Sequence, residues 1–224
     1  MPRRKLHITK KNLEANPSKN ILDLIDKIIF INLEDRKDRL SQLQTEIDKI
    51  DPERSKTIRL EAIKKDNGKL GCALSHIKAL KNAQENNYKN VLILEDDFEF
   101  TKSKEMVNYN LSYLFDNFND FNICLLAGNI AKCRKKTDII YECHDVQTTS
   151  SYIVQGHFLE KLIETFQTAA DKLLHNPPNG TAEIDVEWKK IQGKDSKFYI
   201  FRNKLGKQRS GYSDIEKRHV NYNC

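Results

Sequence analysis

Short apolar segments alternate with amphipathic segments of helix length, and this alternation constrains the fold of the chain more than any other feature. The apolar segments are rich in Ile, Val, Leu and aromatic residues, as buried strands are. The segments between them repeat apolar residues every three or four positions, which indicates helices with one buried face. Strands that alternate with helices predict an α/β fold with a mostly parallel central sheet flanked by helices. The expected strands are 27–32, 57–62, 91–94, 121–126, 151–155 and, as the last one, 198–201; the expected helices are 40–50, a segment from the Gly68–Gly71 turn to Asn86, 104–117 and 158–168.

The length and polarity of the chain indicate one domain. Its 224 residues are 38% hydrophobic and 31% charged, which suffices for a core under a well-hydrated surface. Residues 1–24 are predicted to be a polar leader, and residues 25–224 the folded domain. The segment 175–180, with two prolines and a glycine, is predicted to be a loop.

Charge and cysteine content limit the classes of partner and the compartment. The net charge is +6, but Lys and Arg are interleaved with acids, so no nucleic-acid partner is expected. The excess suits an anionic ligand such as a sugar nucleotide or a phospholipid headgroup, which leaves peripheral membrane contact open. No apolar run approaches the roughly 20 residues of a transmembrane helix, and five cysteines without a secretory signal favour free thiols in the cytoplasm. The sequence does not determine the oligomeric state.

The apolar run 91–94 leads directly into three carboxylates, Glu95, Asp96 and Asp97. The carboxyl ends of parallel strands are where open α/β sheets bind ligands. Three adjacent acids repel one another, and a hard cation such as Mg²⁺ or Mn²⁺ would relieve that repulsion while bridging to a phosphate. A solvated acidic turn is the alternative.

Two further segments carry residue types suited to a phosphate group. Gly71 allows close approach of the backbone at a helix start, where Ser75 and His76 follow within two turns. A structural histidine is the alternative there.

The strand at 27–32 ends in Asn32, and the following helix carries Arg36 and Arg39 on one face. Arginine binds a diphosphate by paired hydrogen bonds. Ion pairs with Glu34, Asp35 and Asp38 are an equally suitable use of these arginines.

An acidic cluster after the 175–180 loop contains Asp185, Glu187 and the single tryptophan, Trp188. A carboxylate here could act as a general base, and the indole could stack on a sugar. Acids that stabilise a helix start are the alternative.

In this order and spacing, these segments resemble glycosyltransferase family 25, which includes lipooligosaccharide and procollagen galactosyltransferases and members from large DNA viruses. The resemblance covers about residues 27–222. It rests on Ile31-Asn32-Leu33 with Arg36 and Arg39, Gly71-Cys72 with Ser75-His76, Leu92–Asp97, Gly128, Ser151-Tyr152-Ile153, the Asp185 cluster and Arg209–Asp214.

The resemblance implies a GT-A-like fold and the inverting, Mn²⁺- or Mg²⁺-dependent transfer of a hexose, galactose or glucose, from a UDP-sugar. The acceptor would be a hydroxyl on a glycan, a lipid-linked saccharide or a protein. It implies that Asp97, with Glu95, binds the metal in the manner of a DXD motif, and that Asp185 is the general base, with Glu187 as its rival. Donor contacts would come from Asn32, Arg36, Arg39, Gly71, Ser75, His76, Glu95 and Asp96, and the acceptor side would include Trp188 and Tyr152.

Two other functions stay open. The same acid cluster would suit a metal-dependent nucleotidyltransferase, although no second spaced acidic pair or Lys-rich phosphate loop accompanies it. A sugar-nucleotide-binding module that has lost turnover would keep the same residues.

Overall fold

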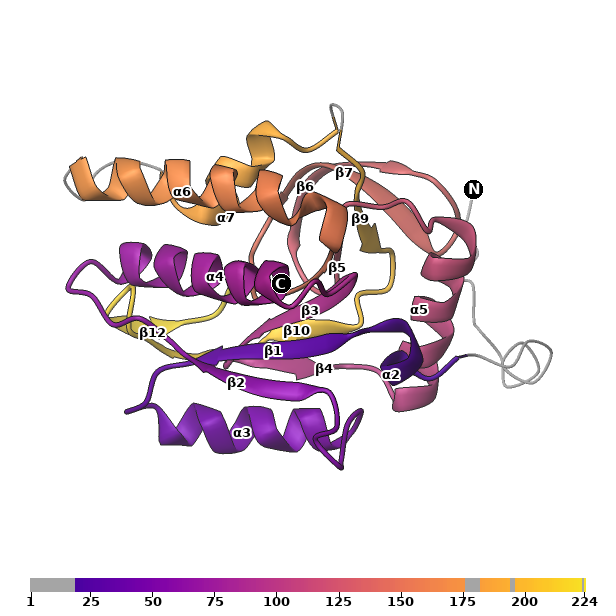
Figure 1. Ribbon diagram of the computed structural model, residues 1–224, viewed down its shortest axis with the longest axis horizontal. Coiled ribbons are helices and arrows are strands. Elements are labelled where there is room, and N and C mark those ends of the chain that lie inside the picture. The colour runs from indigo at the N-terminus through magenta and orange to yellow at the C-terminus, as the bar shows by residue number, and fades with distance from the viewer. Residues whose placement is uncertain (1–18, 176–181, 194–195, 223) are drawn as a thin grey trace.

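The computed structural model describes residues 19–175, 182–193, 196–222 and 224, and an eight-stranded mixed sheet runs through its centre (Figure 1). The strand order is β2-β1-β3-β8-β5-β9-β7-β6. The pairings β1–β2, β1–β3 and β5–β9 are parallel and the others antiparallel, so only β7 and β8 run against the remaining six strands. The prediction of an α/β domain with a mostly parallel sheet is therefore confirmed. The strands of this sheet are β1 (Lys27–Asn32), β2 (Thr57–Glu61), β3 (Asn90–Glu95), β5 (Ile123–Leu125), β6 (Asn129–Lys135), β7 (Ile140–Gln147), β8 (Ser151–Gln155) and β9 (Phe198–Phe201).

Helices cover both faces of the sheet. Figure 1 shows α4 and α6 side by side on one face and α3 on the other, with α5 and α2 toward the far end. Two 3-10 turns, Gly156–Phe158 and Trp188–Lys190, adjoin α6 and α7. The helices are α2 (Ile21–Leu24), α3 (Lys37–Asp48), α4 (Gly68–Glu85), α5 (Lys104–Asn117), α6 (Leu159–His175) and α7 (Ile184–Glu187).

The strands β1, β3, β5, β8 and β9 lack alternation of polar and apolar residues because both of their faces are buried. Successive side chains of β1 point to opposite faces. Ile29 and Ile31 pack in the cluster that contains α4 and α6, whereas Ile28 and Phe30 pack in the cluster that contains α3 and α5. The sheet thus separates two apolar cores.

The predicted elements agree with the structure within a few residues, except at three places. The helix predicted after the Gly68–Gly71 turn includes both glycines, since its N-cap is Asn67. The helix predicted at 158–168 continues to His175, and the loop predicted at 175–180 lies, beyond His175, outside the described residues. The strand at 198–201 is not the last one, because three short strands follow it. They are β10 (Gly206–Gln208), which pairs with the earlier strand β4 (Phe98–Phe100), and β11 (Gly211–Ser213), which pairs with β12 (Arg218–Val220).

The hairpin of β6 and β7 was not predicted, and the reason is its exposure. Six of the seven residues of β6 are exposed, so this edge strand carries no apolar run. In β7 only Ile140, Cys143 and Val146 are buried, at a spacing of three that does not indicate a strand. The hairpin continues the sheet through backbone pairing, which side-chain patterns do not report.

Part of the predicted leader belongs to the folded domain. Ile21 and Leu24 are buried, and the amide of Ile21 donates to Asn108 of α5 at 2.9 Å. Asn20 caps the short helix α2. The domain therefore begins before residue 25 among the described residues, and residues 1–18 lie outside them.

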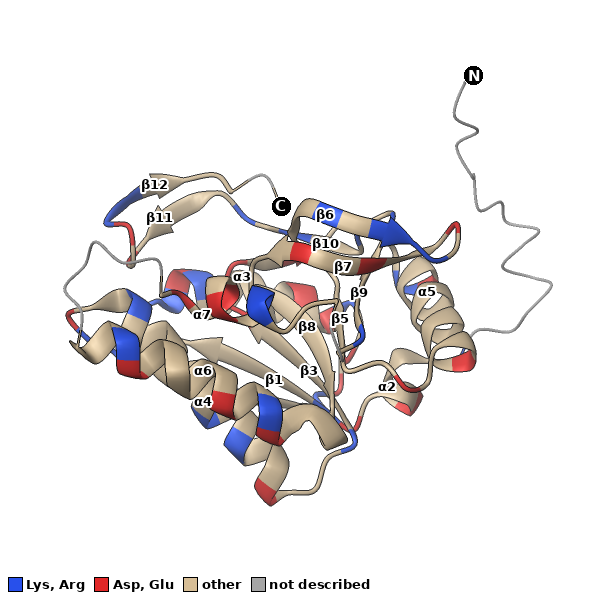
Figure 2. Cartoon of the chain, turned by 90° about the horizontal axis from the view of Figure 1, so that it is seen from above, with Lys and Arg blue, Asp and Glu red and all other residues tan. Residues whose placement is uncertain are grey.

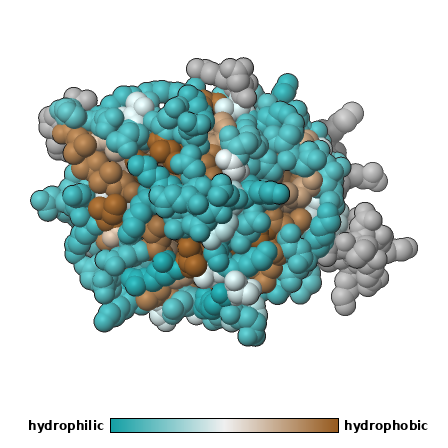
Figure 3. Space-filling model, in the orientation of Figure 1, coloured by the Kyte–Doolittle hydropathy of each residue, from teal (hydrophilic) through white to brown (hydrophobic). Residues whose placement is uncertain are grey.

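The surface is mixed in charge and mostly hydrophilic. Figure 2 shows basic and acidic residues intermingled along α4 and α6. On the face in Figure 3, hydrophobic residues form several small areas between hydrophilic ones. Within the described part of the chain, no helix combines the length and apolarity that a membrane crossing needs.

Gly71 permits a close contact between α4 and the loop that follows β2. A Cβ atom at this position would lie 2.6 Å from the carbonyl oxygen of Ile63. The Ile63 amide in turn donates to the Ser75 hydroxyl at 2.8 Å, and that hydroxyl donates to the Gly71 carbonyl at 2.7 Å. Gly71 and Ser75 thus hold the loop after β2 against α4.

Gly71→Ala is expected to lower the free energy of unfolding by about 1–2 kcal/mol. The backbone must shift to admit the methyl group, and this cost exceeds the gain of about 1 kcal/mol in helix propensity. Gly211→Ala is the matched control, because nothing lies within 4 Å of its added Cβ. Urea unfolding measures both variants, and equal stabilities would contradict the close contact.

Candidate active site

The carboxyl ends of β1, β2 and β3 meet at one edge of the sheet, and a cavity of about 410 Å³ opens there. Its walls come from the ends of β1 and β3, the start of α4 and the segment 208–222. Of the residues predicted for the donor and the metal, the lining includes Asn32, Arg39, Gly71, Ser75, His76, Glu95, Asp96 and Asp97. The fold thus brings three separate sequence segments to one place.

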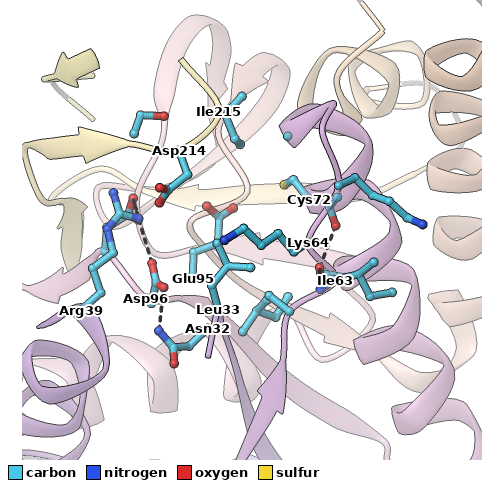
Figure 4. A pocket seen from close by; sticks show the side chains of 18 of the residues that line it. Asn32, Leu33, Arg39, Ile63, Lys64, Cys72, Glu95, Asp96, Asp214 and Ile215 are labelled. Atoms are coloured by element: carbon cyan, nitrogen blue, oxygen red, sulfur yellow. Dashed lines mark hydrogen bonds and ion pairs between the residues drawn. The ribbon is translucent and has the colours of Figure 1, made fainter. Parts of the chain in front are cut away.

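The three acids at the end of β3 have different environments, and Figure 4 shows two of them, Glu95 and Asp96. The Asp96 carboxylate accepts hydrogen bonds from Asn32 Nδ2 and Arg39 Nη1, both at 2.8 Å. Asp97 Oδ2 accepts from Arg39 Nη1 and from Gln208 Nε2, each at 3.1 Å. The other oxygen of Asp97, Oδ1, is buried and has no hydrogen-bond partner among the described residues.

Burial and mutual repulsion shift the acidity of this cluster. Burial, together with the charge of Glu95, raises the pKa of Asp97 to about 7. Burial also raises the pKa of Asp96, although Arg39 opposes the shift. Burial would raise the pKa of Glu95 too, but hydrogen bonds from His76 and Thr149 outweigh it and lower the pKa.

This donor set fits a hard divalent cation. Asp97 supplies a buried carboxylate oxygen without a partner, and a cation would satisfy it and offset the repulsion from Glu95. Arg39 offsets part of the same charge, because its guanidinium bridges Asp96 and Asp97. A bound cation would therefore balance the negative charge that Arg39 leaves unpaired, which includes the Asp97 Oδ1 atom.

His76 is buried beneath the cavity and holds Glu95. Its Nε2 lies 3.2 Å from Glu95 Oε1, and its Nδ1 lies 3.0 Å from the hydroxyl of Tyr152. Thr149 Oγ1 donates to the same Glu95 oxygen at 2.7 Å. His76 lines the cavity as predicted, yet it is only 1% exposed and its protein contacts orient a carboxylate.

Ser75 also lines the cavity, but its hydroxyl already joins the Gly71 carbonyl to the Ile63 amide. These bonds give Ser75 a clear part in shaping the wall.

The two arginines of the α3 region have separate positions. Arg39 lies in the cavity wall, and its Nη2 donates to the carbonyl of Tyr212 at 2.6 Å. Arg36 lies outside the lining and forms ion pairs with Asp38 and Asp214. The alternative of a local ion pair thus describes Arg36, while Arg39 faces the site.

A second cavity, of about 260 Å³, adjoins the first and contains Asp185. The two cavities share Cys72 and Glu95 in their walls. Asp185 Oδ2 accepts a hydrogen bond from the Thr148 amide at 3.1 Å, and burial raises the pKa of its carboxyl. Lys69 and Glu183 form an ion pair on the same wall.

Three residues predicted near the acceptor lie elsewhere. Glu187, the predicted alternative to Asp185, lines neither cavity; its carboxylate lies 2.9 Å from Lys172 Nζ and 2.7 Å from Lys190 Nζ. Trp188 and Tyr152 are both 0% exposed. Their rings pack against each other in the core, which rules out the predicted stacking on a sugar in this conformation. A tryptophan side chain packs in an apolar core as readily as it stacks on a sugar, and the sequence does not distinguish these two roles.

The segment 208–222 adds cavity residues to which the sequence assigned no role. Gln208, Tyr212, Asp214 and Ile215 line the cavity, where Figure 4 shows Asp214 and Ile215, and Ile215 lies against Gly68 at the start of α4. In the sequence, only the resemblance of residues 209–214 to glycosyltransferase family 25 indicates that this segment belongs to the site. Cys72 lies one turn before His76 on α4, and that spacing is the signal in the sequence that could have placed it in the site.

The model of glycosyltransferase family 25, described as an LPS biosynthesis protein family, matches residues 64–177, which is 114 of the 224 residues. The chain belongs to glycosyltransferase family 25. It is therefore a glycosyltransferase, as the resemblance implied. The matched part contains Cys72, His76 and the Glu95–Asp97 cluster, whereas Asn32 and Asp185 lie outside it.

One of the similar solved structures reaches a TM-score above 0.5 and shows the same fold as this glycosyltransferase. A glycosyltransferase involved in glycosylation of the major capsid of PBCV-1 is similar over 85% of this chain and 95% of its own, with a TM-score of 0.55 and 10% identity. Protein A197 from STIV has a TM-score of 0.47 and 12% identity, with 87% of this chain and 92% of its own covered. A UDP-glucose pyrophosphorylase has a TM-score of 0.47 and 11% identity, with 82% and 74% covered. None of the curated proteins matches the chain in sequence.

The raised pKa of Asp97 predicts a pH-dependent loss of stability in the absence of metal. An aspartate has a pKa of 3.8 when unperturbed and about 7 here, so the folded state binds this proton more tightly than the unfolded state. The associated stability is present below pH 4 and is lost as the pH rises through 7. Asp97→Asn cannot titrate. In EDTA, its stability relative to the wild type is therefore expected to rise by up to about 4 kcal/mol between pH 4 and pH 8. Urea unfolding at both pH values measures this, and a pH-independent difference would contradict the burial of an ionised Asp97.

Proposed function

We propose that this glycosyltransferase transfers a hexose, galactose or glucose, from a UDP-sugar to a hydroxyl group, with a Mn²⁺ or Mg²⁺ ion and inversion at the anomeric carbon. The observation that carries the proposal is the pairing of two adjoining cavities, one with the acid cluster Glu95–Asp97 and one with the half-buried Asp185. The first suits a diphosphate donor, and the second suits an acceptor. Glu95 stands at their junction.

The donor side suits a nucleoside diphosphate sugar. Its volume of about 410 Å³ falls within the usual range of small-ligand sites. Arg39 offers a guanidinium, and Lys64, Lys65 and Lys217 line the same cavity. These cations would attract the diphosphate, whose charge the acid cluster alone would repel.

Asp97 and Glu95 are the residues proposed to hold the metal. When bound, a divalent cation supplies positive charge that stabilises the leaving diphosphate. His76 and Thr149 orient Glu95 for this purpose, and Gln208 with Arg39 fixes Asp97.

Asp185 is proposed to be the general base. It would accept the proton of the acceptor hydroxyl as the oxygen bonds to the anomeric carbon and the bond to the diphosphate breaks. Burial raises the pKa of Asp185, which makes its carboxylate a stronger base than an exposed aspartate. The acids of the first cavity cannot serve, because they face the leaving group.

The second cavity is lined mainly by polar side chains, including Asn129, Gln147, Thr148 and Glu183. Such a lining suits a hydroxyl-rich acceptor on a glycan, a lipid-linked saccharide or a protein. A cytoplasmic location is part of the proposal, since all five cysteines are free thiols.

UDP binding is expected to require a divalent cation and Asp97. In calorimetry, the wild type should bind UDP in Mn²⁺ and lose most affinity in EDTA, whereas Asp97→Asn should bind equally weakly in both. Glu187→Gln is the control, since Glu187 lies outside both cavities. Equal UDP affinity of the wild type in EDTA and in Mn²⁺ would overturn the metal assignment.

A donor panel tests the transfer itself. UDP-galactose, UDP-glucose, UDP-GlcNAc and GDP-sugars are incubated with Mn²⁺, and release of the nucleoside diphosphate is measured. Release of UDP from a UDP-hexose supports the proposal. Release of pyrophosphate from a sugar phosphate and UTP would indicate a nucleotidyltransferase, and binding without turnover would indicate an inactive module.

Asp185→Asn is expected to lower the transfer rate by about 10²–10⁴-fold while UDP-sugar affinity stays within a factor of two or so, because the change removes only the proton acceptor. Glu187→Gln should have little effect on the rate. Steady-state kinetics with the donor found by the panel measures both. The opposite ranking of the two variants would assign the base to Glu187.

A further inference from the structure

We propose that Cys72, His76 and Glu95 form a binding site for a thiophilic divalent cation such as Zn²⁺; this site shares Glu95 with the site proposed for Mn²⁺ or Mg²⁺ but does not include Asp97. One ligand atom from each residue, the thiol sulfur, an imidazole nitrogen and a carboxylate oxygen, lies within 4.8 Å of the other two. This is the sole group of three such residues found in the described part of the chain. The inference does not depend on the proposed sugar donor.

The geometry requires little adjustment. Two ligands of one tetrahedral zinc ion lie roughly 3.4–3.6 Å apart, given Zn–N and Zn–S bonds of about 2.0–2.3 Å. His76 Nε2 and Glu95 Oε1 already lie 3.2 Å apart. The sulfur therefore needs to move by about 1 Å, which rotation of the Cys72 side chain can supply. Figure 4 shows Cys72 on the α4 wall beside Glu95.

The scaffold presents the three side chains from rigid elements. Cys72 and His76 are four residues apart on α4 and so lie on one face of that helix. Glu95 is the last residue of β3, in the middle of the sheet. A site built on a helix and a central strand keeps its geometry better than one built on loops.

The surrounding hydrogen bonds suit a histidine that binds a metal. The hydroxyl oxygen of Tyr152, 3.0 Å from His76 Nδ1, can accept a hydrogen bond from Nδ1–H in the tautomer that leaves the Nε2 lone pair for the cation. Thr149 meanwhile holds Glu95 by a bond of 2.7 Å. Each of these two ligands thus has an outer partner that fixes its orientation.

The ligand types distinguish this site from the carboxylate cluster. A thiolate and an imidazole favour Zn²⁺ or Co²⁺, whereas carboxylates alone favour Mg²⁺ and Mn²⁺. The thiol proton of Cys72 passes to solvent as the sulfur–metal bond forms. Three protein ligands leave a fourth position, and because Cys72 and Glu95 line both cavities, a water molecule or a ligand oxygen from either cavity can take it.

Cobalt spectroscopy tests the site without any sugar nucleotide, so its failure and the failure of the proposed function are distinguishable. The full chain is freed of metal with EDTA, desalted, and titrated with Co²⁺. We expect a saturable sulfur-to-cobalt charge-transfer absorption, which reports the Cys72 site alone, and we expect Zn²⁺ to displace the cobalt and abolish this absorption. Cys72→Ser should lose this absorption and bind Zn²⁺ at least about tenfold more weakly by calorimetry.

Two variants identify the ligands. Cys133→Ser is the matched control, because Cys133 is a half-buried free thiol on β6 outside both cavities, and it should retain the absorption. Asp97→Asn should also retain it. Glu95→Gln, with circular dichroism to verify folding, provides a second test should Cys72→Ser fail to fold, and it should weaken Zn²⁺ binding while the sulfur band remains.

Three results would overturn the proposal. They are the absence of a sulfur-to-cobalt band in the wild type, unchanged Zn²⁺ affinity in both Cys72→Ser and Glu95→Gln, and loss of the band in Cys133→Ser or Asp97→Asn but not in Cys72→Ser.

Discussion

Three consecutive carboxylates lie at the end of β3, two of them buried and Glu95 half-buried, and this is the constraint on which the rest of the site depends. Asp96 and Asp97 are each only 7% exposed, and unpaired buried charges are costly. The structure offsets that cost with donors from four parts of the chain: Asn32 from β1, Arg39 from α3, His76 from α4 and Gln208 from β10. These contacts also join the surrounding elements to the sheet. The same hydrogen bonds therefore offset the charge of the cluster and shape the cavity.

The balance is incomplete at one atom. Arg39 bridges Asp96 and Asp97, and His76 with Thr149 stabilises ionised Glu95, but Asp97 Oδ1 stays without a partner among the described residues. A structural role alone would favour an amide or a hydroxyl there, because either would avoid the penalty for a buried charge. A carboxylate kept in that place is consistent with a cation that binds during function.

The fold and the chemistry rest on different observations. Similarity to the viral glycosyltransferase at 10% identity shows the arrangement of strands and helices and no more. The family match over residues 64–177 shows the class of enzyme. The proposals for the donor, the metal and the base rest on the site itself. There, Glu95 and Cys72 line both the cavity that contains several Lys and Arg side chains and the cavity that contains Asp185.

Hydrophobic periodicity in the sequence determined the α/β class and the principal helices and strands, because strands buried on both faces and helices with one buried face leave distinct patterns. It also determined that Glu95, Asp96 and Asp97 follow a central strand. Strand pairing at the edges left no such pattern, so β6, β10, β11 and β12 could be identified only in the structure. Only the tertiary structure decided which polar residues share the site. It placed Arg39 in the cavity and Arg36 outside it, buried Trp188 in the core, tied Glu187 to two lysines and set Cys72 beside Glu95. These outcomes depend on contacts between residues far apart in the chain, and local sequence patterns carry no information about such distances.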